Sequence, residues 1–272
     1  MVDILTSKSM NISTYKYIIN KINSQGALHF SLIDPDPVKQ SPKKAAKIAE
    51  YAYEAGTDAI LIGGSTVFDQ RFVDDTILAI KEKVDLPVII FPGGITNISK
   101  EADAILFMSL LNSEDINNII GSQALASYTI KVLNIEPIST AYLIVEPGGT
   151  AGWIGRAKLL PRNKPKLTAA YSLAAEMIGF KLIYLEAGSG SERMPSEIIR
   201  LCSGMLNIPI IVGGGVISRD TAREFIEAGA SIIVMGTYLE NNILHDNGIS
   251  LKSIIEEIKE AGNQCKKSYP LK

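Results

Sequence analysis

Residues 176–189 read EMIGFKLIYLEAGS, and the same kind of stretch occurs twice more in the chain. The related stretches are EAGTDAILIGGS at 54–65 and IEAGASIIVMGT at 226–237. In each, a helical pattern ends at a glycine, an apolar run follows, and small residues close the run. Glycine after a helix accepts the left-handed backbone that ends it. The apolar runs are continuous rather than alternating, which is typical of strands buried on both faces of a parallel sheet.

Apolar runs of this kind predict eight strands, and helical patterns separate most of them. The predicted strands are 27–34, 59–63, 87–91, 104–110, 140–146, 181–186, 209–213 and 231–235. The predicted helices are 43–55, 70–83, 114–133, 168–178, 196–205, 219–228 and 250–260. This alternation predicts an α/β fold, a single-domain (β/α)8 TIM barrel. We expect the barrel over about 27–260, after a helical extension at 1–26. An open doubly wound sheet is the alternative.

Two connections depart from the repeat. Segment 94–103 is too short for a normal helix, so we expect the helix between the third and fourth strands to be shortened or missing. Segment 147–167 is the longest connection without periodicity, and such loops are usually functional or disordered.

Composition narrows the class of protein. A net charge of −2 over 272 residues argues against non-specific nucleic-acid binding. Cys202 and Cys265 lack metal-ligand spacing and fit a reducing compartment better than a disulfide framework, although the two could pair. The N-terminus has no signal-peptide core, and no apolar run reaches the roughly 20 residues of a membrane span. We therefore expect a cytoplasmic protein.

The last three predicted strands each end in glycines, at Gly188 and Gly190, at Gly213–Gly215 and at Gly236. Glycines let a phosphate approach main-chain amides, and the loops after the last two strands of this fold often bind phosphate. Ser218 is a plausible N-cap of the next helix, whose positive end would face the anion. The alternative is that these glycines only make tight turns.

Three further residues at strand ends could carry chemistry. Asp34 is a candidate Mg²⁺ ligand, with Ser65 as a second oxygen donor, because magnesium is held by one or two carboxylates plus waters and substrate phosphates. Asp34 could instead only cap a turn. Glu186 could accept a proton from a substrate hydroxyl, and Tyr184 lies two residues before it on the same strand face. A structural ion pair is the alternative role for Glu186.

Other polar residues have simpler interpretations. We expect His29 to be a core residue and His245 to lie in a polar loop. Trp153 could be a packing residue of its loop. The cations around it could be a solvated loop or a clamp for a polyphosphate: Arg156, Lys158, Arg162, Lys164 and Lys166.

Eight motifs in order resemble one known family, the geranylgeranylglyceryl phosphate synthases. They are HFSLIDPD (29–36), GGST (63–66), FPGGI (91–95), MSLLNS (108–113), VEPGGTA (145–151), YLEAGSG (184–190), VGGGV (212–216) and MGT (235–237). The resemblance implies a Mg²⁺-dependent prenyltransferase of archaeal lipid synthesis. In it, the 3-hydroxyl of sn-glycerol 1-phosphate attacks C1 of geranylgeranyl diphosphate, and diphosphate leaves.

The resemblance also assigns residues. Asp34 and Ser65 look like the metal positions, and Glu186 looks like the base. The glycerol phosphate site would comprise Tyr184, Leu185, Glu186, Ala187, Gly188, Ser189, Gly190, Gly214, Gly215, Gly236 and Thr237. One branch of the family has a lysine where this chain has Leu32, which points, with the long loop, to the second sequence group.

The prenyl chain needs an apolar groove on the barrel rim, which Tyr142, Tyr171 or Phe68 could border. The family forms dimers and larger rings, so we expect a homo-oligomer, a dimer or hexamer, and peripheral membrane contact stays open. Two alternatives remain. One is a phosphate-binding barrel of the sugar-phosphate isomerase type, in which Asp34 is an acid. The other is a non-catalytic barrel that binds phosphorylated ligands.

Overall fold

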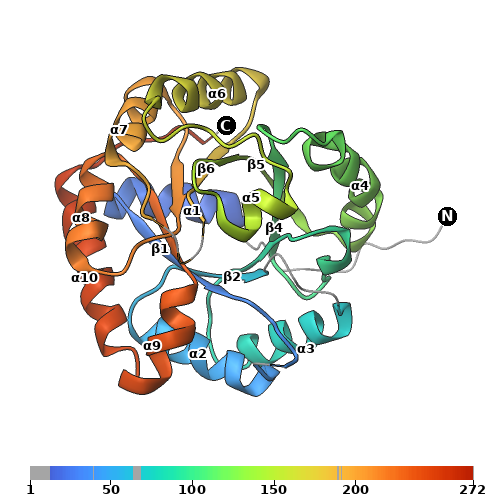
Figure 1. Ribbon diagram of the computed structural model, residues 1–272. Coiled ribbons are helices and arrows are strands. Elements are labelled where there is room, and N and C mark those ends of the chain that lie inside the picture. Colours follow the sequence, from blue (N-terminus) through green and yellow to red (C-terminus); the bar gives the residue numbers. More distant parts are fainter. Residues whose placement is uncertain (1–12, 39, 64–68, 189, 191, 272) are drawn as a thin grey trace.

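The computed structural model describes residues 13–38, 40–63, 69–188, 190 and 192–271. Its strands form a closed parallel barrel in the order β1 to β8, with helices around it (Figure 1). The strands are β1 Leu28–Ile33, β2 Ala59–Gly63, β3 Val88–Phe91, β4 Ala104–Leu110, β5 Glu136–Ile144, β6 Leu182–Glu186, β7 Ile210–Gly213 and β8 Ile232–Met235. The predicted barrel is therefore confirmed, and the open sheet is excluded because β1 pairs with β8.

The helices follow the strands in the expected alternation. They are α1 Thr14–Gln25, α2 Pro42–Glu54, α3 Gln70–Lys81, α4 Ser122–Leu133, α5 Gly149–Ile154, α6 Pro165–Ile178, α7 Ser196–Met205, α8 Arg219–Glu227, α9 Thr237–Asp246 and α10 Ile249–Gln264. Between β3 and β4 the described chain makes only the 3-10 turn η1, Ile95–Asn97, so the predicted loss of that helix is confirmed. A short π-helix, η2 Asn117–Gly121, precedes α4.

The structure corrects the sequence prediction at two connections. The segment predicted as a loop at 147–167 contains α5 and the start of α6. The helix α9 was not predicted, and His245 lies in its last turn rather than in a polar loop.

Apolar side chains fill two layers on either side of the barrel wall. Inward-facing residues such as Phe30, Leu61 and Tyr184 pack together inside the barrel. Their neighbours in sequence, such as Leu185, pack outward against the helices. This alternation is what a strand buried on both faces requires, and it explains the continuous apolar runs.

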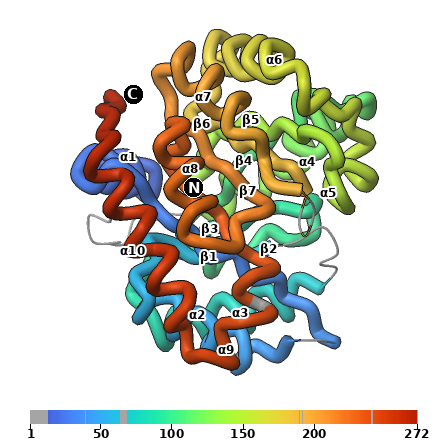
Figure 2. The backbone as a smooth tube through the Cα atoms, turned by 60° about the vertical axis from the view of Figure 1, so that its left-hand side comes forward, coloured from blue at the N-terminus to red at the C-terminus, as the bar shows by residue number. Residues whose placement is uncertain are grey.

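One end of the barrel is closed by α1. Ile18, Ile19 and Ile22 of this helix join the apolar cluster of the barrel interior. The helix lies behind the strands in Figure 1 and against α10 in Figure 2. The carboxylate of Glu136 accepts hydrogen bonds from the amides of Thr14 (2.6 Å) and Tyr15 (3.2 Å), at the positive end of the helix.

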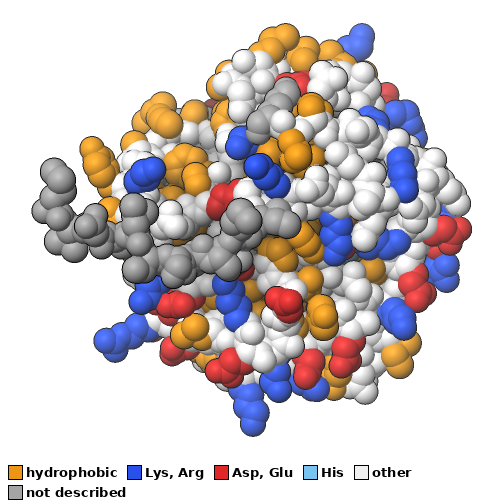
Figure 3. Space-filling view, turned by 180° about the vertical axis from the view of Figure 1, so that it is seen from behind, with side chains coloured by type: hydrophobic (Ala, Val, Ile, Leu, Met, Phe, Trp, Pro, Cys, Tyr) orange, Lys and Arg blue, Asp and Glu red, His pale blue; other side chains and the backbone are white. Residues whose placement is uncertain are grey.

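Tyr269, near the C-terminus, packs into the same interior cluster as α1. Its main chain exchanges two hydrogen bonds with the side chain of Asn23, at 2.9 and 2.8 Å. The outer surface of this end carries acidic and basic side chains interspersed along its lower edge (Figure 3). We call the end of the barrel that α1 closes the floor. Because the floor is closed, we expect the chemistry at the opposite end.

A buried carboxylate joins the floor to the barrel. Asp58 is 2% exposed and forms ion pairs with Lys21 of α1 (2.9 Å) and with Lys259 of α10. It also accepts a hydrogen bond from the amide of His29 (2.8 Å). Burial lowers the pKa of His29 to about 3, so this side chain is neutral. His29 is completely buried, which confirms its prediction as a core residue.

Candidate active site

A polar cavity of about 520 Å³ lies at the carboxyl ends of β6, β7 and β8. It brings together most of the residues that the sequence predicted for phosphate binding: Tyr184, Glu186, Gly190, Gly214, Gly215, Gly236 and Thr237. Gly188 precedes Gly190 in the same loop, and Ser189 lies outside the described residues. Leu185 and Ala187 point their side chains into the outer core, so only their main chain could face a ligand.

The glycines of this cavity could not be replaced by larger residues without strain, because of their backbone conformation or because a neighbouring atom lies too close. Gly214 and Gly215 have φ angles of 83° and 75°, in the left-handed region that favours glycine. A Cβ atom at Gly214 would lie 2.7 Å from the Glu186 Oε1 atom. Ser218 caps α8 by accepting a hydrogen bond from the Thr221 amide, as predicted, and Thr221 lines the cavity. The positive end of α8 therefore faces this space.

Glu186 is the acidic side chain among the residues that line the polar cavity. It ends β6, points inward two residues after Tyr184, and is 6% exposed. Burial raises its pKa to about 7, although hydrogen bonds from the Gly188 and Ala187 amides and the Tyr184 hydroxyl oppose the rise. The Gly188 amide lies 2.7 Å from Oε1. Within the described part of the chain, no cation forms an ion pair with this carboxylate, so the structural alternative finds no support. A carboxyl group with this pKa can exchange a proton near neutral pH.

Three aromatic rings pack together beside the end of β6, and Tyr184 among them donates a hydrogen bond to Glu186. We call them the ring cluster: Phe91, Tyr142 and Tyr184. Tyr142 and Tyr184 are register neighbours on β5 and β6, with ring centroids 5.2 Å apart. Phe91, at the end of β3, lies 5.3 Å from Tyr184 and 6.0 Å from Tyr142. Gly213 leaves room for this arrangement, because a Cβ atom there would collide with the Tyr184 hydroxyl.

A second, apolar cavity of about 150 Å³ lies on the other side of the ring cluster. It opens between β3, β4 and α4, where η1 replaces a full helix. Its lining includes Phe91, Ile95, Phe107, Tyr142, Ala151 and Ile154. Tyr142 lines this cavity, and its predicted place at the border of the prenyl groove stays a prediction. Tyr171 lies on α6, away from the residues that line the cavity, and Phe68 lies outside the described residues.

Asp34 directly follows β1 and continues the inward alternation of Phe30 and Leu32. Its negative charge contributes to the raised pKa of Tyr184, after burial and the charges of Glu186 and Tyr142. Ser65, the other predicted metal ligand, lies outside the described residues. In the described ranges, no group of three or more acidic, histidine or cysteine side chains could cage a metal. The single carboxylate of Asp34 is enough for Mg²⁺, because this ion commonly takes one or two protein carboxylates and completes its coordination with water and substrate phosphates.

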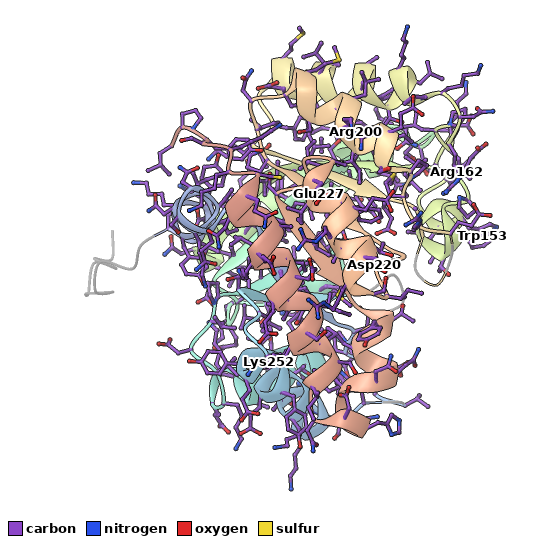
Figure 4. All side chains as sticks on the ribbon, turned by 90° about the vertical axis from the view of Figure 1, so that its left-hand side faces the viewer. Trp153, Arg162, Arg200, Asp220, Glu227 and Lys252 are labelled. Atoms are coloured by element: carbon purple, nitrogen blue, oxygen red, sulfur yellow. The ribbon has the colours of Figure 1, made fainter. Side chains whose placement is uncertain are left out.

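The cations of the 147–167 connection have mixed surroundings. Arg162 donates hydrogen bonds to the carbonyls of Glu146 (3.1 Å) and Arg193 (2.8 Å), so it fastens this connection to the loop after β6. Arg156 lies 3.7 Å from Asp115. Trp153 is 84% exposed and lies with Arg162 at the end opposite α1 (Figure 4), so its prediction as a packing residue was wrong. The clamp for a polyphosphate stays a prediction.

Sequence reasoning missed several residues that line the polar cavity. Tyr238, Asn241 and Asn242 come from α9, the helix that was not predicted. Arg193 also lines the cavity and lies 2.5 Å from Glu224 of α8. A Cβ atom at Gly215 would lie 2.5 Å from the Arg193 Cα atom, and this proximity could not be inferred from spacing in the sequence.

A glycine-lined cavity with a buried carboxylate, at the carboxyl ends of the strands, is typical of barrel enzymes that act on phosphorylated substrates. The profile of the PcrB family matches residues 20–261, and this chain belongs to that family.

Several proteins named geranylgeranylglyceryl phosphate synthase are similar to this chain over most of its length. The chain is 49% identical over 244 residues to the geranylgeranylglyceryl phosphate synthase of Pyrococcus abyssi, covering 89% of this chain and 95% of the relative. It is 52% identical over 226 residues to the synthase of the same name from Thermococcus gammatolerans, covering 83% and 88%. The crystal structure of (S)-3-O-geranylgeranylglyceryl phosphate synthase from Thermoplasma acidophilum, in complex with its substrate sn-glycerol-1-phosphate, superposes with a TM-score of 0.87. That enzyme is 43% identical, with coverage of 92% of this chain and all of the other.

Proposed function

We propose that this chain transfers a geranylgeranyl group from geranylgeranyl diphosphate to the 3-hydroxyl of sn-glycerol 1-phosphate and releases diphosphate. One observation carries the proposal. A polar, glycine-lined cavity that contains Glu186 meets an apolar cavity across the ring cluster. A reaction between a small phosphorylated alcohol and a long hydrocarbon needs two adjoining spaces of these two kinds.

The phosphate of glycerol phosphate fits the glycine-lined part of the polar cavity. Main-chain amides around Gly214, Gly215 and Gly236 and the positive end of α8 favour an anion there. Glu186 faces the same space, at contact distance from Gly214. A phosphate held at these glycines would therefore place the alcohol of its glycerol within reach of the carboxylate.

The alcohol then attacks the prenyl carbon while Glu186 takes the hydroxyl proton. Burial suits Glu186 to this role, because a carboxylate in an apolar site is a stronger base than one in water. The hydrocarbon chain would lie in the apolar cavity, between η1, α4 and α5.

Magnesium is part of the proposal, with Asp34 as its protein ligand and the remaining positions on substrate oxygens and water. When bound, the ion supplies positive charge that stabilises the departing diphosphate. Two observations support this assignment. Asp34 lies at the carboxyl end of β1, and its charge contributes to the raised pKa of Tyr184 in the site.

Incubating the purified chain with sn-glycerol 1-phosphate, Mg²⁺ and prenyl diphosphates of 15, 20 and 35 carbons, then weighing the products, tests the proposal. We expect the 20-carbon ether with one diphosphate per product. Isomerised sugar phosphates without diphosphate release would favour the isomerase alternative. Binding of glycerol phosphate without any turnover would favour a non-catalytic barrel.

Self-association and a cytoplasmic location also belong to the proposal. Leu125, Tyr128 and Val132 are exposed on the outer face of α4, which supports a contact between copies as a dimer or hexamer. In the described part of the chain, no helix combines the length and apolarity that crossing a bilayer would need. Light scattering and cell fractionation test these two points.

A further inference from the structure

Arg193 is the only cation among the described residues that line the polar cavity. The other charged side chain of this lining is the Glu186 carboxylate. The inference below rests on the proposed function, in which a phosphate with up to two negative charges enters the cavity beside Glu186. Main-chain amides and a helix end offer only partial positive charges. A full positive charge at Arg193 would therefore be a strong addition to the attraction on the substrate.

The main chain of Arg193 is held beside the glycines of the cavity by two contacts. A Cβ atom at Gly215 would lie 2.5 Å from the Arg193 Cα atom, so the two backbones lie close together. Arg162 donates a hydrogen bond of 2.8 Å to the Arg193 carbonyl. The side chain of Arg193 therefore starts from a fixed place next to the glycines at which the phosphate would bind.

The guanidinium group of Arg193 keeps hydrogen-bond donors for a ligand. Its Nη1 atom donates to the Glu224 Oε2 atom at 2.5 Å. Within the described ranges, its Nε and Nη2 atoms donate no hydrogen bond. Arg162, in contrast, already uses Nη1 and Nη2 on the carbonyls of Glu146 and Arg193. Because a guanidinium presents its donors in one plane, Arg193 can keep its contact with Glu224 and still bind a phosphate.

We propose that Arg193 binds the phosphate of glycerol phosphate and that Glu224 positions its guanidinium group for this contact. The Arg193 side chain is 52% exposed, so water screens the attraction and the effect on affinity is moderate. The negative charge of Glu224 repels the phosphate. Glutamine at position 224 would keep an oxygen for the guanidinium group and remove that repulsion.

Calorimetry with sn-glycerol 1-phosphate, in the absence of a prenyl substrate, measures this contact without turnover. We expect Arg193→Gln to raise the Kd about tenfold, as the loss of one charge-assisted hydrogen bond at a part-exposed site predicts. Arg193→Lys keeps the charge but not the planar donors, so it recovers part of the affinity. Arg200→Gln is the control and leaves the Kd unchanged, because Arg200 is exposed on α7 and does not line the cavity (Figure 4).

Glu224→Gln separates phosphate binding from a purely structural role. Arg193→Gln and Glu224→Gln both remove the ion pair between the loop after β6 and α8. If Arg193 binds phosphate, the two variants have opposite effects, and Glu224→Gln lowers the Kd about twofold. If both variants raise the Kd alike, the ion pair only fastens the loop and the inference is wrong. A melting temperature within a few degrees of wild type for each variant ensures that the Kd reports binding.

The outcomes also distinguish this inference from the proposed function. If the wild-type chain forms the prenyl ether and Arg193→Gln leaves the Kd unchanged, the inference is wrong and the function stands. If the wild-type chain neither binds glycerol phosphate nor forms an ether from any prenyl diphosphate, the proposed function fails, and the inference fails with it.

Discussion

Replacing Glu186 with glutamine should make the folded protein more stable while removing its activity. Glutamine has nearly the same volume, and its carbonyl oxygen can still accept the hydrogen bond from the Gly188 amide at 2.7 Å. It cannot accept a proton from an attacking alcohol. We therefore expect product formation to fall at least about 100-fold, the usual contribution of a general base.

The gain in stability follows from the raised pKa of Glu186. Burial moves this pKa from its ordinary value of 4.5 to about 7. The native state thus holds the proton more tightly than the unfolded chain. Between pH 4.5 and 7 it binds more protons, so the free energy of unfolding falls as the pH rises through that window. Above pH 7 the ionised carboxylate costs the native state about 3 kcal/mol, which the glutamine variant does not lose.

Urea unfolding at pH 5 and pH 8 measures the effect. The stability difference between E186Q and wild type should grow from less than about 1 kcal/mol at pH 5 to about 3 kcal/mol at pH 8. Glu257→Gln is the matched control. Glu257 is also buried, but hydrogen bonds from Arg219 and Arg223 lower its pKa below the ordinary 4.5. Its carboxylate is therefore ionised at both pH values, and this substitution should destabilise the protein about equally at pH 5 and pH 8. An E186Q difference that does not change with pH would refute the reasoning.

Four further predictions follow from the same structure. The value of kcat/KM should fall about tenfold per pH unit below about 7, because the Glu186 carboxylate becomes protonated. If the residual activity of E186Q falls with acid in the same way, the fall belongs to the substrate phosphate, which titrates near pH 6. Gly214→Ala should raise the KM for glycerol phosphate at least tenfold by crowding Glu186, whereas Gly179→Ala, at φ 109° with open space around it, should only lower stability by about 1 kcal/mol. Asp34→Asn should abolish activity at low Mg²⁺ without unfolding the barrel, as circular dichroism would show; full activity in EDTA would exclude the metal. Asp58→Asn should lower stability by about 3 kcal/mol, because it removes the buried partner of two part-buried lysine charges, and kcat per folded molecule should not change. A reduced kcat would show that the floor is coupled to the site.

The strands were predictable from sequence because each is buried on both faces. An apolar run between a helix-ending glycine and a small residue has few other structures available to it, and β2, β6 and β8 follow that pattern. The start of β5 was missed because Glu136 and Pro137 resemble a turn. Glu136 is instead fixed by its hydrogen bonds to the start of α1, more than 120 residues away in sequence.

Only those residues of the site that stand at strand ends could be predicted, because the order of the strands along the chain fixes where these residues meet. Strand ends must meet at one end of a parallel barrel, so Glu186, Gly214 and Gly236 could be grouped without coordinates. The ring cluster could not, because Phe91 meets Tyr142 and Tyr184 across the barrel interior and only side-chain packing brings them together. The α9 residues of the site were missed because asparagines at 241 and 242 weaken the helical pattern.

The pairing of Asn23 with Tyr269 has a consequence for synthesis on the ribosome. These residues are 246 positions apart, so the floor of the barrel cannot be completed until Tyr269 has left the exit tunnel of the ribosome. Until then α1 has no partner for this edge, and the nascent chain exposes apolar surface that chaperones recognise. A truncation just before Tyr269 should therefore lower the yield of native protein far more than it lowers the activity of the molecules that do fold.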